Sequence, residues 1–94
     1  MFQNKQIRIF FKGQAKDVYT IMKSRNDKNS KTILNSIERA INNLKQNPQY
    51  GNPIAKTLIP EKYSKLEIKN LYRIELSNYW RMLYTIEGNK IEIF

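Results

Sequence analysis

Two arginines and one glutamate lie close together in a hydrophobic stretch near the end of the sequence, LYRIELSNYWRMLYTI (residues 71–86). Arg73 and Glu75 are two residues apart, and Arg81 follows after a short polar turn. A guanidinium binds phosphate oxygens through paired hydrogen bonds and does not lose its charge in proteins. It can also stabilise the negative charge that develops in a transition state. The stretch therefore predicts either an anion site or an ordinary charged sheet surface with one ion pair.

The rest of the composition limits the chemistry that is possible. The 94 residues include no histidine and no cysteine, which removes the usual general base and the commonest zinc ligands. No metal or cofactor is expected. Seventeen Lys and Arg against eight Asp and Glu give a net charge of +9. This excess favours polyanionic partners such as RNA, DNA or the ribosome, although a lysine-rich composition that only maintains solubility explains it equally well.

The spacing of apolar residues predicts two helices in the first half of the chain. Residues 5–11 are rich in β-branched and aromatic types and predict a strand before them. Helical spacing then covers residues 14–25 and, more clearly, residues 33–44. Asn29 or Ser30 is expected to cap the second helix, which should end before Asn47 and Pro48. Helices joined by so short a turn should form an antiparallel hairpin.

Three further strands are expected over residues 71–76, 80–86 and 90–94, with a tight turn at Gly88-Asn89. The predicted order is β-α-α-β-β-β in one domain over residues 1–94. The fold class is α+β, with the helical hairpin packed on a small, mainly antiparallel sheet of four strands.

The register of the first predicted hairpin decides where the arginines point. A three-residue loop over 77–79 pairs Ile74 with Met82 and places both on an apolar face. Arg73, Glu75 and Arg81 then share the opposite face. A two-residue loop would mix charged and apolar side chains on both faces, so the longer loop is preferred.

The segment over residues 47–70 is interrupted by prolines and glycine and carries a group of lysines. They are interpreted either as a solvated surface or as a contact to the RNA backbone. The candidates are Lys56, Lys62, Lys65 and Lys69.

The residues 71–76 (LYRIEL) and 80–84 (WRMLY), preceded by a helical hairpin and LKQNPQYG, resemble the RelE/ParE superfamily of toxin–antitoxin toxins. The resemblance covers nearly the whole chain and implies the same β-α-α-β-β-β core. RelE-like members are ribosome-dependent ribonucleases that cut mRNA in the ribosomal A site, and ParE-like members poison DNA gyrase. The resemblance thus implies a toxin that inhibits translation, without metal or cofactor, and a small antitoxin protein encoded nearby.

Carried over by position, the resemblance gives Arg81 the contact to the scissile phosphate and Arg73 an assisting role. Glu75 replaces a basic residue of the RelE pattern and could act as a base on the 2′-hydroxyl or neutralise Arg81; Tyr84 is a weaker candidate for proton transfer. The basic C-terminal tail usual in the family is also missing after Phe94. A ParE-like gyrase inhibitor or a catalytically inactive RelE-fold binding protein is the alternative. A cytoplasmic protein without membrane contact is expected, because the N-terminal apolar run is too short for a signal peptide.

Overall fold

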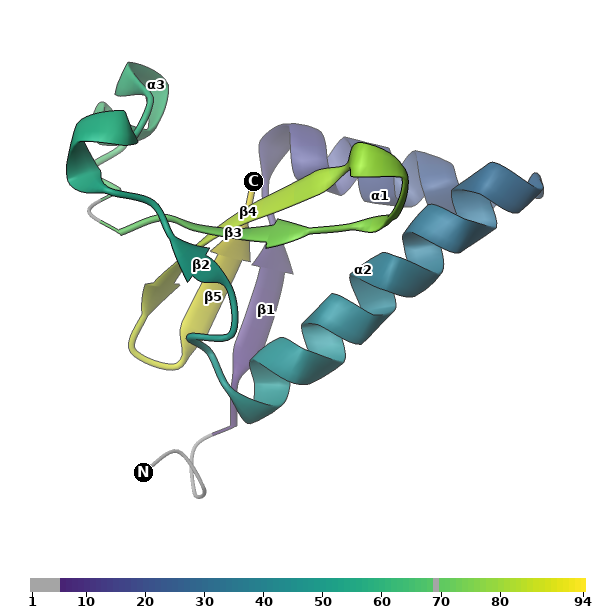
Figure 1. Ribbon diagram of the computed structural model, residues 1–94, viewed down its shortest axis with the longest axis horizontal. Coiled ribbons are helices and arrows are strands. Elements are labelled where there is room, and N and C mark those ends of the chain that lie inside the picture. Colours follow the sequence, from purple (N-terminus) through teal and green to yellow (C-terminus); the bar gives the residue numbers. More distant parts are fainter. Residues whose placement is uncertain (1–5, 69) are drawn as a thin grey trace.

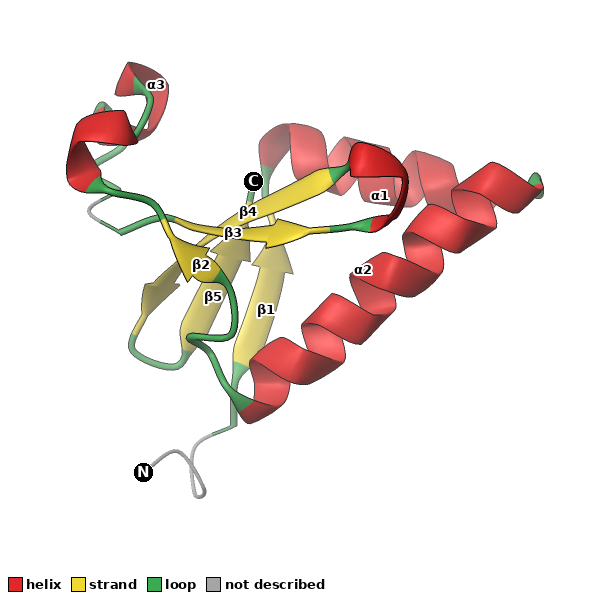
Figure 2. Cartoon of the chain, viewed as in Figure 1, coloured by secondary structure: helices red, strands yellow, loops and turns green. Residues whose placement is uncertain are grey.

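The computed structural model describes residues 6–68 and 70–94. Its long elements follow the predicted β-α-α-β-β-β order, and the two long helices lie along one side of the sheet (Figure 1). Shorter elements fill the connection between the second helix and the hairpin (Figure 2). The elements in chain order are β1 (Arg8–Phe11), α1 (Gly13–Ser24), α2 (Lys28–Gln46), β2 (Asn52–Pro53), η1 (Lys56–Leu58), α3 (Glu61–Ser64), β3 (Tyr72–Glu75), η2 (Ser77–Tyr79), β4 (Arg81–Glu87) and β5 (Lys90–Ile93). Residue 5, the start of the first predicted strand, lies outside the described residues.

The sheet has five strands in the order β1-β5-β4-β3-β2, so the prediction of four strands was wrong in number. The additional strand, β2, has only two residues and pairs with Arg73 and Tyr72 at one edge. So short a strand shows no alternation in the sequence, and its proline suits an edge position. The sheet is also mixed, because β1 runs parallel to β5 while the other pairs are antiparallel. Along the chain, both long helices come after β1 and before β5. They therefore provide the long crossover connection that a parallel pair of strands needs.

The second helix begins earlier than predicted and is capped by a different residue. Asp27 is the N-cap: its carboxylate accepts hydrogen bonds from the backbone N–H of Ser30 at 3.0 Å and from the Ser30 hydroxyl at 2.9 Å. Both bonds lower the pKa of the Asp27 carboxyl, and the bond from the backbone N–H has the larger effect. Asn29 and Ser30 were therefore wrong as caps. The apolar stripe that located the helix starts only at Ile33, one turn after the true N-terminus.

The core lies between α2 and one face of the sheet. The apolar stripe of α2 and the alternate residues of three strands form a single buried cluster. Burying a Leu or Ile side chain fully contributes about 1.5–3 kcal/mol. The most deeply buried members are Ile33, Leu44, Tyr84, Ile91 and Ile93.

The register of the β3–β4 hairpin confirms the prediction. Ile74 pairs with Met82, and Glu75 pairs with Arg81. The loop over Ser77–Tyr79 has three residues and is closed by a 2.7 Å hydrogen bond from the Leu76 N–H to the Trp80 carbonyl. Asn78 has the expected left-handed backbone (φ 59°), and Tyr79 unexpectedly has one as well (φ 64°). The second predicted turn, at Gly88-Asn89, is also present between β4 and β5.

Candidate functional site

The β3–β4 hairpin places Arg73, Glu75 and Arg81 on the sheet face opposite the core. Arg73 and Glu75 are two residues apart on β3, so their side chains leave the strand on the same side. Arg81 lies directly opposite Glu75 as the first residue of β4. In between, Ile74 and Met82 point into the buried cluster. Two antiparallel strands and a short turn therefore fix the relative positions of the three charges.

Glu75 bridges the two arginines. The Arg73 Nε lies 3.3 Å from one carboxylate oxygen, and the Arg81 Nε lies 3.6 Å from the other. The side chains are 41%, 54% and 62% exposed for Arg73, Glu75 and Arg81, so each pair contributes at most about 1 kcal/mol to stability. Both contacts use Nε of the guanidinium group. We call these three residues the arginine cluster; two positive charges and one negative charge give it a net charge of +1.

The Nε of Arg73 has an unusual environment. It is buried and makes no hydrogen bond among the described residues, although Glu75 is within ion-pair distance. A buried donor without a partner is unfavourable by about 1–3 kcal/mol, more where the group is charged. An anion binding at the cluster that drew Glu75 into better alignment, or replaced it, would relieve this deficit.

The structure separates the predicted lysines from the arginine cluster. Lys56 lies on η1, Lys62 on α3 and Lys65 just after it, while Lys69 lies outside the described residues. Figure 1 places α3 beyond the start of β3, whereas the turn that leads to Arg81 is at the other end of the hairpin. The Lys65 Nζ lies 3.7 Å from an oxygen of Glu61. The described lysines thus lie on elements at the other end of the hairpin from Arg81.

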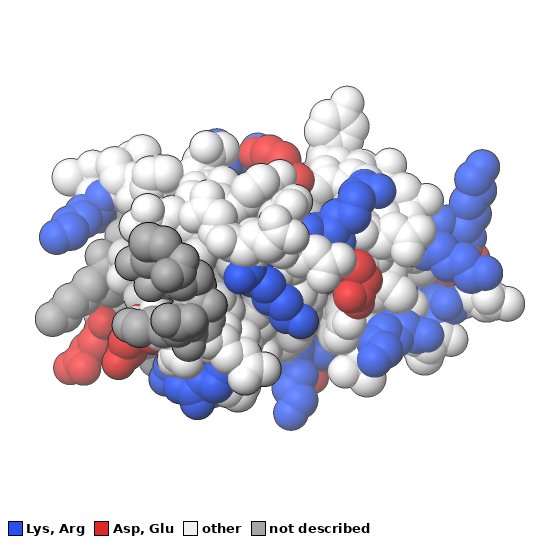
Figure 3. Space-filling model, turned by 90° about the horizontal axis from the view of Figure 1, so that it is seen from below, with Lys and Arg blue, Asp and Glu red and all other residues white. Residues whose placement is uncertain are grey.

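The lysine segment nevertheless borders the face that carries the cluster. The ring of Tyr63 on α3 packs against Phe94, with 5.5 Å between ring centroids. Ile93 points into the core, so Phe94, the next residue, points to the opposite face. Figure 3, which shows the molecule from below, has lysine and arginine side chains scattered over that side, with acidic side chains beside several of them. On this side the positive charge is dispersed.

Tyr84, the weaker candidate for proton transfer, is part of the core. It is fully buried, its hydroxyl donates to the Pro48 carbonyl at 3.0 Å, and it accepts from the Gly51 N–H at 2.8 Å. Burial raises the pKa of Tyr84. The side chain holds the loop after α2 against the sheet and is unavailable to a substrate.

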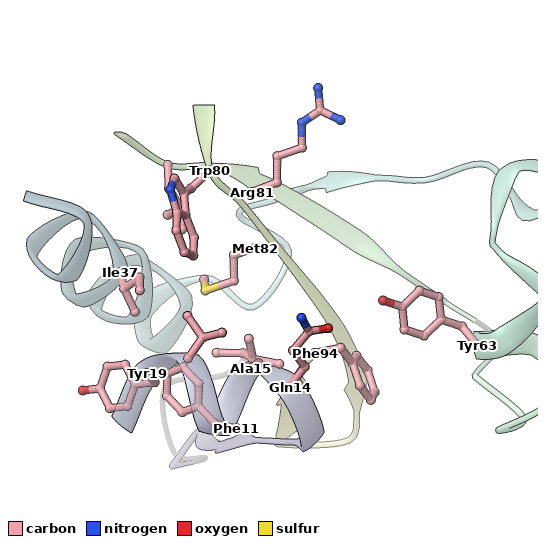
Figure 4. Close-up of a pocket in the computed structure, with 13 residues that line it drawn as sticks. Phe11, Gln14, Ala15, Tyr19, Ile37, Tyr63, Trp80, Arg81, Met82 and Phe94 are labelled. Atoms are coloured by element: carbon pink, nitrogen blue, oxygen red, sulfur yellow. The ribbon is translucent and has the colours of Figure 1, made fainter. Parts of the chain in front are cut away.

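A groove beside Arg81 was not predicted from the sequence. It lies between α1 and the start of β4 and has a volume of about 220 Å³. Figure 4 shows Trp80 and Met82 directed toward the helices and Arg81 directed away from them. Its lining comes from residues spread between Phe11 and Phe94, so no local motif could have revealed it. Trp80, an aromatic residue that is 38% exposed next to a candidate site residue, was the one available signal.

The described residues contain neither a cluster of metal ligands nor a membrane-spanning helix. Among residues 6–68 and 70–94, no group of three or more acidic, histidine or cysteine side chains could hold a metal ion. No helix in this part of the chain is both long and apolar enough to span a bilayer.

Comparison with known proteins adds no further information on the site. No protein-family model matches the sequence, and no curated protein or solved structure shows significant similarity to the chain. The arginine cluster and its surroundings are therefore the basis for assigning a function.

Proposed function

We propose that this protein is a RelE-like toxin of a type II toxin–antitoxin module, an endoribonuclease that cuts mRNA on the ribosome and so inhibits translation. The observation that carries the proposal is the arginine cluster. Arg73, Glu75 and Arg81 lie together on the face of the hairpin opposite the core, with Glu75 within 3.6 Å of both guanidinium groups. The order of the long elements, β-α-α-β-β-β, agrees with the resemblance on which the proposal also depends.

The cluster supplies the groups that a metal-independent cleavage of RNA requires. The 2′-oxygen attacks the adjacent phosphorus in line with the bond to the 5′-oxygen of the next nucleotide, which breaks. Arg81 stabilises the negative charge that develops on the phosphate, and Arg73 orients it. Glu75 accepts the proton of the 2′-hydroxyl, and water protonates the departing 5′-oxygen. The product is a 2′,3′-cyclic phosphate.

The lysine segment and the general positive charge suit a partner as large as the ribosome. Lys56, Lys62 and Lys65 contact the RNA backbone away from the cut and contribute affinity without reading sequence. With a net charge of +9, the free toxin is complementary to a small acidic antitoxin encoded nearby, which would cover this surface. A protein that acts on translating ribosomes works in the cytoplasm.

A second candidate is a binding protein that does not cleave, either an inactive RelE-fold protein or a ParE-like gyrase inhibitor. The bridging position of Glu75 favours it, because a carboxylate paired with both arginines reduces their attraction for a phosphate. In this alternative Glu75 restrains Arg81, and the protein acts by occupying a surface.

A translating extract separates the two candidates. Purified protein is added to ribosomes engaged on a defined mRNA, and the RNA ends are mapped by primer extension. The nuclease predicts new ends within the A-site codon that carry a cyclic phosphate. Intact mRNA with the protein bound to ribosomes would refute cleavage, and inhibition of DNA supercoiling by gyrase would identify the ParE-like activity.

A further inference from the structure

The groove beside Arg81 has no role in the cleavage proposed above. It lies beside the part of β4 that precedes its pairing with β5: the last pair between these two strands is Tyr84 with Ile93, and β4 begins three residues earlier at Arg81. Among the described residues, Phe94 continues the pairing by donating its N–H to the Leu83 carbonyl at 2.9 Å. Among residues 6–68 and 70–94, no strand lies beside β4 beyond that point.

The lining of the groove is mainly apolar and aromatic. Phe11, Tyr19, Tyr63, Trp80 and Phe94 contribute aromatic rings, and Arg81 lies at the rim with its side chain directed away from the helices. Phe11 and Tyr19 are themselves stacked, with 4.3 Å between their centroids. At 38% exposure, Trp80 can be reached from solvent. A flat apolar ligand can therefore enter from the side on which Trp80 is exposed.

We infer that this groove binds one nucleobase of a single-stranded RNA whose adjoining phosphate lies on Arg81. The inference rests on the proposed function and extends it from the phosphate to the base. Arg81 belongs both to the arginine cluster and to the rim of the groove. A nucleotide connects its base to its phosphate through a single sugar, so a base site must adjoin the phosphate site in this way.

Size and chemistry agree with a base as the occupant. A volume of about 220 Å³ is below the roughly 300–1,000 Å³ of pockets for drug-sized ligands, and it suits one planar ring system. Proteins that bind single-stranded RNA stack its unpaired bases on aromatic side chains and surround them with positive charge. The amide of Gln14 and the hydroxyl of Tyr63 also line the groove and can hydrogen-bond to the edge of a base.

The charges argue against the other occupants. A second copy of this chain would bring another net charge of +9 toward Arg81, and like charges in contact oppose association. An apolar side chain of a partner protein would fill the groove but would not use the cation at its rim. A nucleotide of RNA uses both the groove and the cation, because its base can fill the groove while its phosphate contacts Arg81.

Trp80 is the only tryptophan of the chain, so its fluorescence reports directly on the groove. Short 2′-O-methyl oligoribonucleotides, which cannot be cleaved, are titrated at low salt up to millimolar concentration, beside an abasic oligomer of the same length. The oligomer with bases should change the Trp80 emission and bind roughly 5- to 150-fold more tightly than the abasic one. Equal affinities, or no change in emission, would overturn the inference.

Two variants test whether the base binds in this groove. Ala15 lines the groove from α1, whereas Thr20 lies on an exposed position of the same helix. Ala15→Leu should remove the affinity gained from the base, while Thr20→Leu should leave binding as it is. Circular dichroism verifies that both variants fold. As an independent measurement, photo-crosslinking of a 4-thiouridine oligomer should label Trp80 or Phe94; labelling only at Lys56, Lys62 or Lys65 would contradict a base in the groove.

The outcomes separate this inference from the proposed nuclease. Binding that depends on Arg81 but not on the base would keep the phosphate site and refute the base site. Dependence on the base with no cleavage on the ribosome would keep the base site and refute the nuclease. Emission that changes with protein concentration alone would assign the groove to a second copy and overturn the inference.

Discussion

Replacing Glu75 by Gln tests how the arginine cluster works. The substitution keeps the size of the side chain and removes the negative charge that lies 3.3 Å from the Arg73 Nε and 3.6 Å from the Arg81 Nε. The net charge of the cluster rises from +1 to +2. A phosphate at the site then meets two arginines without a competing carboxylate.

The size of the effect follows from the exposure of these side chains, which is between 41% and 62%. One unit charge acting at about 4 Å through a water-like medium is worth about 1 kcal/mol, or about fivefold in Kd. If one more phosphate contact forms, the plot of log K against log salt should steepen by about 0.7 for single-stranded RNA. Stability should fall by no more than about 1 kcal/mol, since exposed ion pairs contribute little.

The assay measures RNA affinity at several salt concentrations together with the cleavage rate on ribosomes. Glu87→Gln is the matched control, because Glu87 lies on the same strand and the same face as Arg81, about 20 Å away. Glu87→Gln removes the same charge, but far from the cluster. The salt dependence of RNA binding should therefore not steepen as it does for Glu75→Gln. Weaker RNA binding by Glu75→Gln would refute the description of Glu75 as a competitor of phosphate.

Cleavage by the same variant decides the role of Glu75. If the carboxylate accepts the proton, Glu75→Gln should bind more tightly and cleave about 10²–10⁴-fold more slowly. If binding and cleavage both increase, Glu75 restrains Arg81 and does not take part in proton transfer.

Three further predictions concern the scaffold. Tyr84→Phe should lower the free energy of unfolding by about 1–3 kcal/mol in urea denaturation, because the Gly51 N–H and the Pro48 carbonyl lose a buried partner; an unchanged midpoint would contradict this role. Gly51→Ala should lower it by about 1–3 kcal/mol, because a Cβ there would lie 2.7 Å from the Tyr84 hydroxyl; an equally stable variant would show that the loop shifts freely. The hydrogen bond to Glu38 is the main cause that raises the pKa of Tyr19 from 10.0 to about 12. Because the folded pKa is the higher one, this contribution to stability is present below pH 10 and is lost between pH 10 and 12; thermal unfolding of Tyr19→Phe should lack this part of the decline.

Local patterns were sufficient to predict the hairpin that carries the cluster. Alternation along the strands and the tolerance of Asn78 for a left-handed backbone identified one register, and Glu75 pairs with Arg81 as that register requires. The stripe of α2 was equally clear, because helical spacing persists over several turns. These elements are encoded within short stretches of sequence.

Other features depend on contacts that no local pattern contains. The two residues of β2 pair with β3 in a loop that the Tyr84 hydroxyl holds against the sheet. Asp27 was missed as a cap because the first turn of α2 is polar. The second contact of Glu75, to Arg73, depends on side-chain geometry within the hairpin. The groove beside Arg81 arises where side chains from distant segments meet, so only the folded chain reveals it.

The most direct test of the central claim is the rate at which Arg81→Ala cuts ribosome-bound mRNA. Removing one group that stabilises a developing charge typically lowers the rate about 10²–10³-fold. Arg25→Ala removes the same charge at the end of α1 and is the control. We predict a loss of this size for Arg81→Ala and an unchanged rate for Arg25→Ala. Equal cleavage by the two variants would contradict the assignment of the arginine cluster as the site.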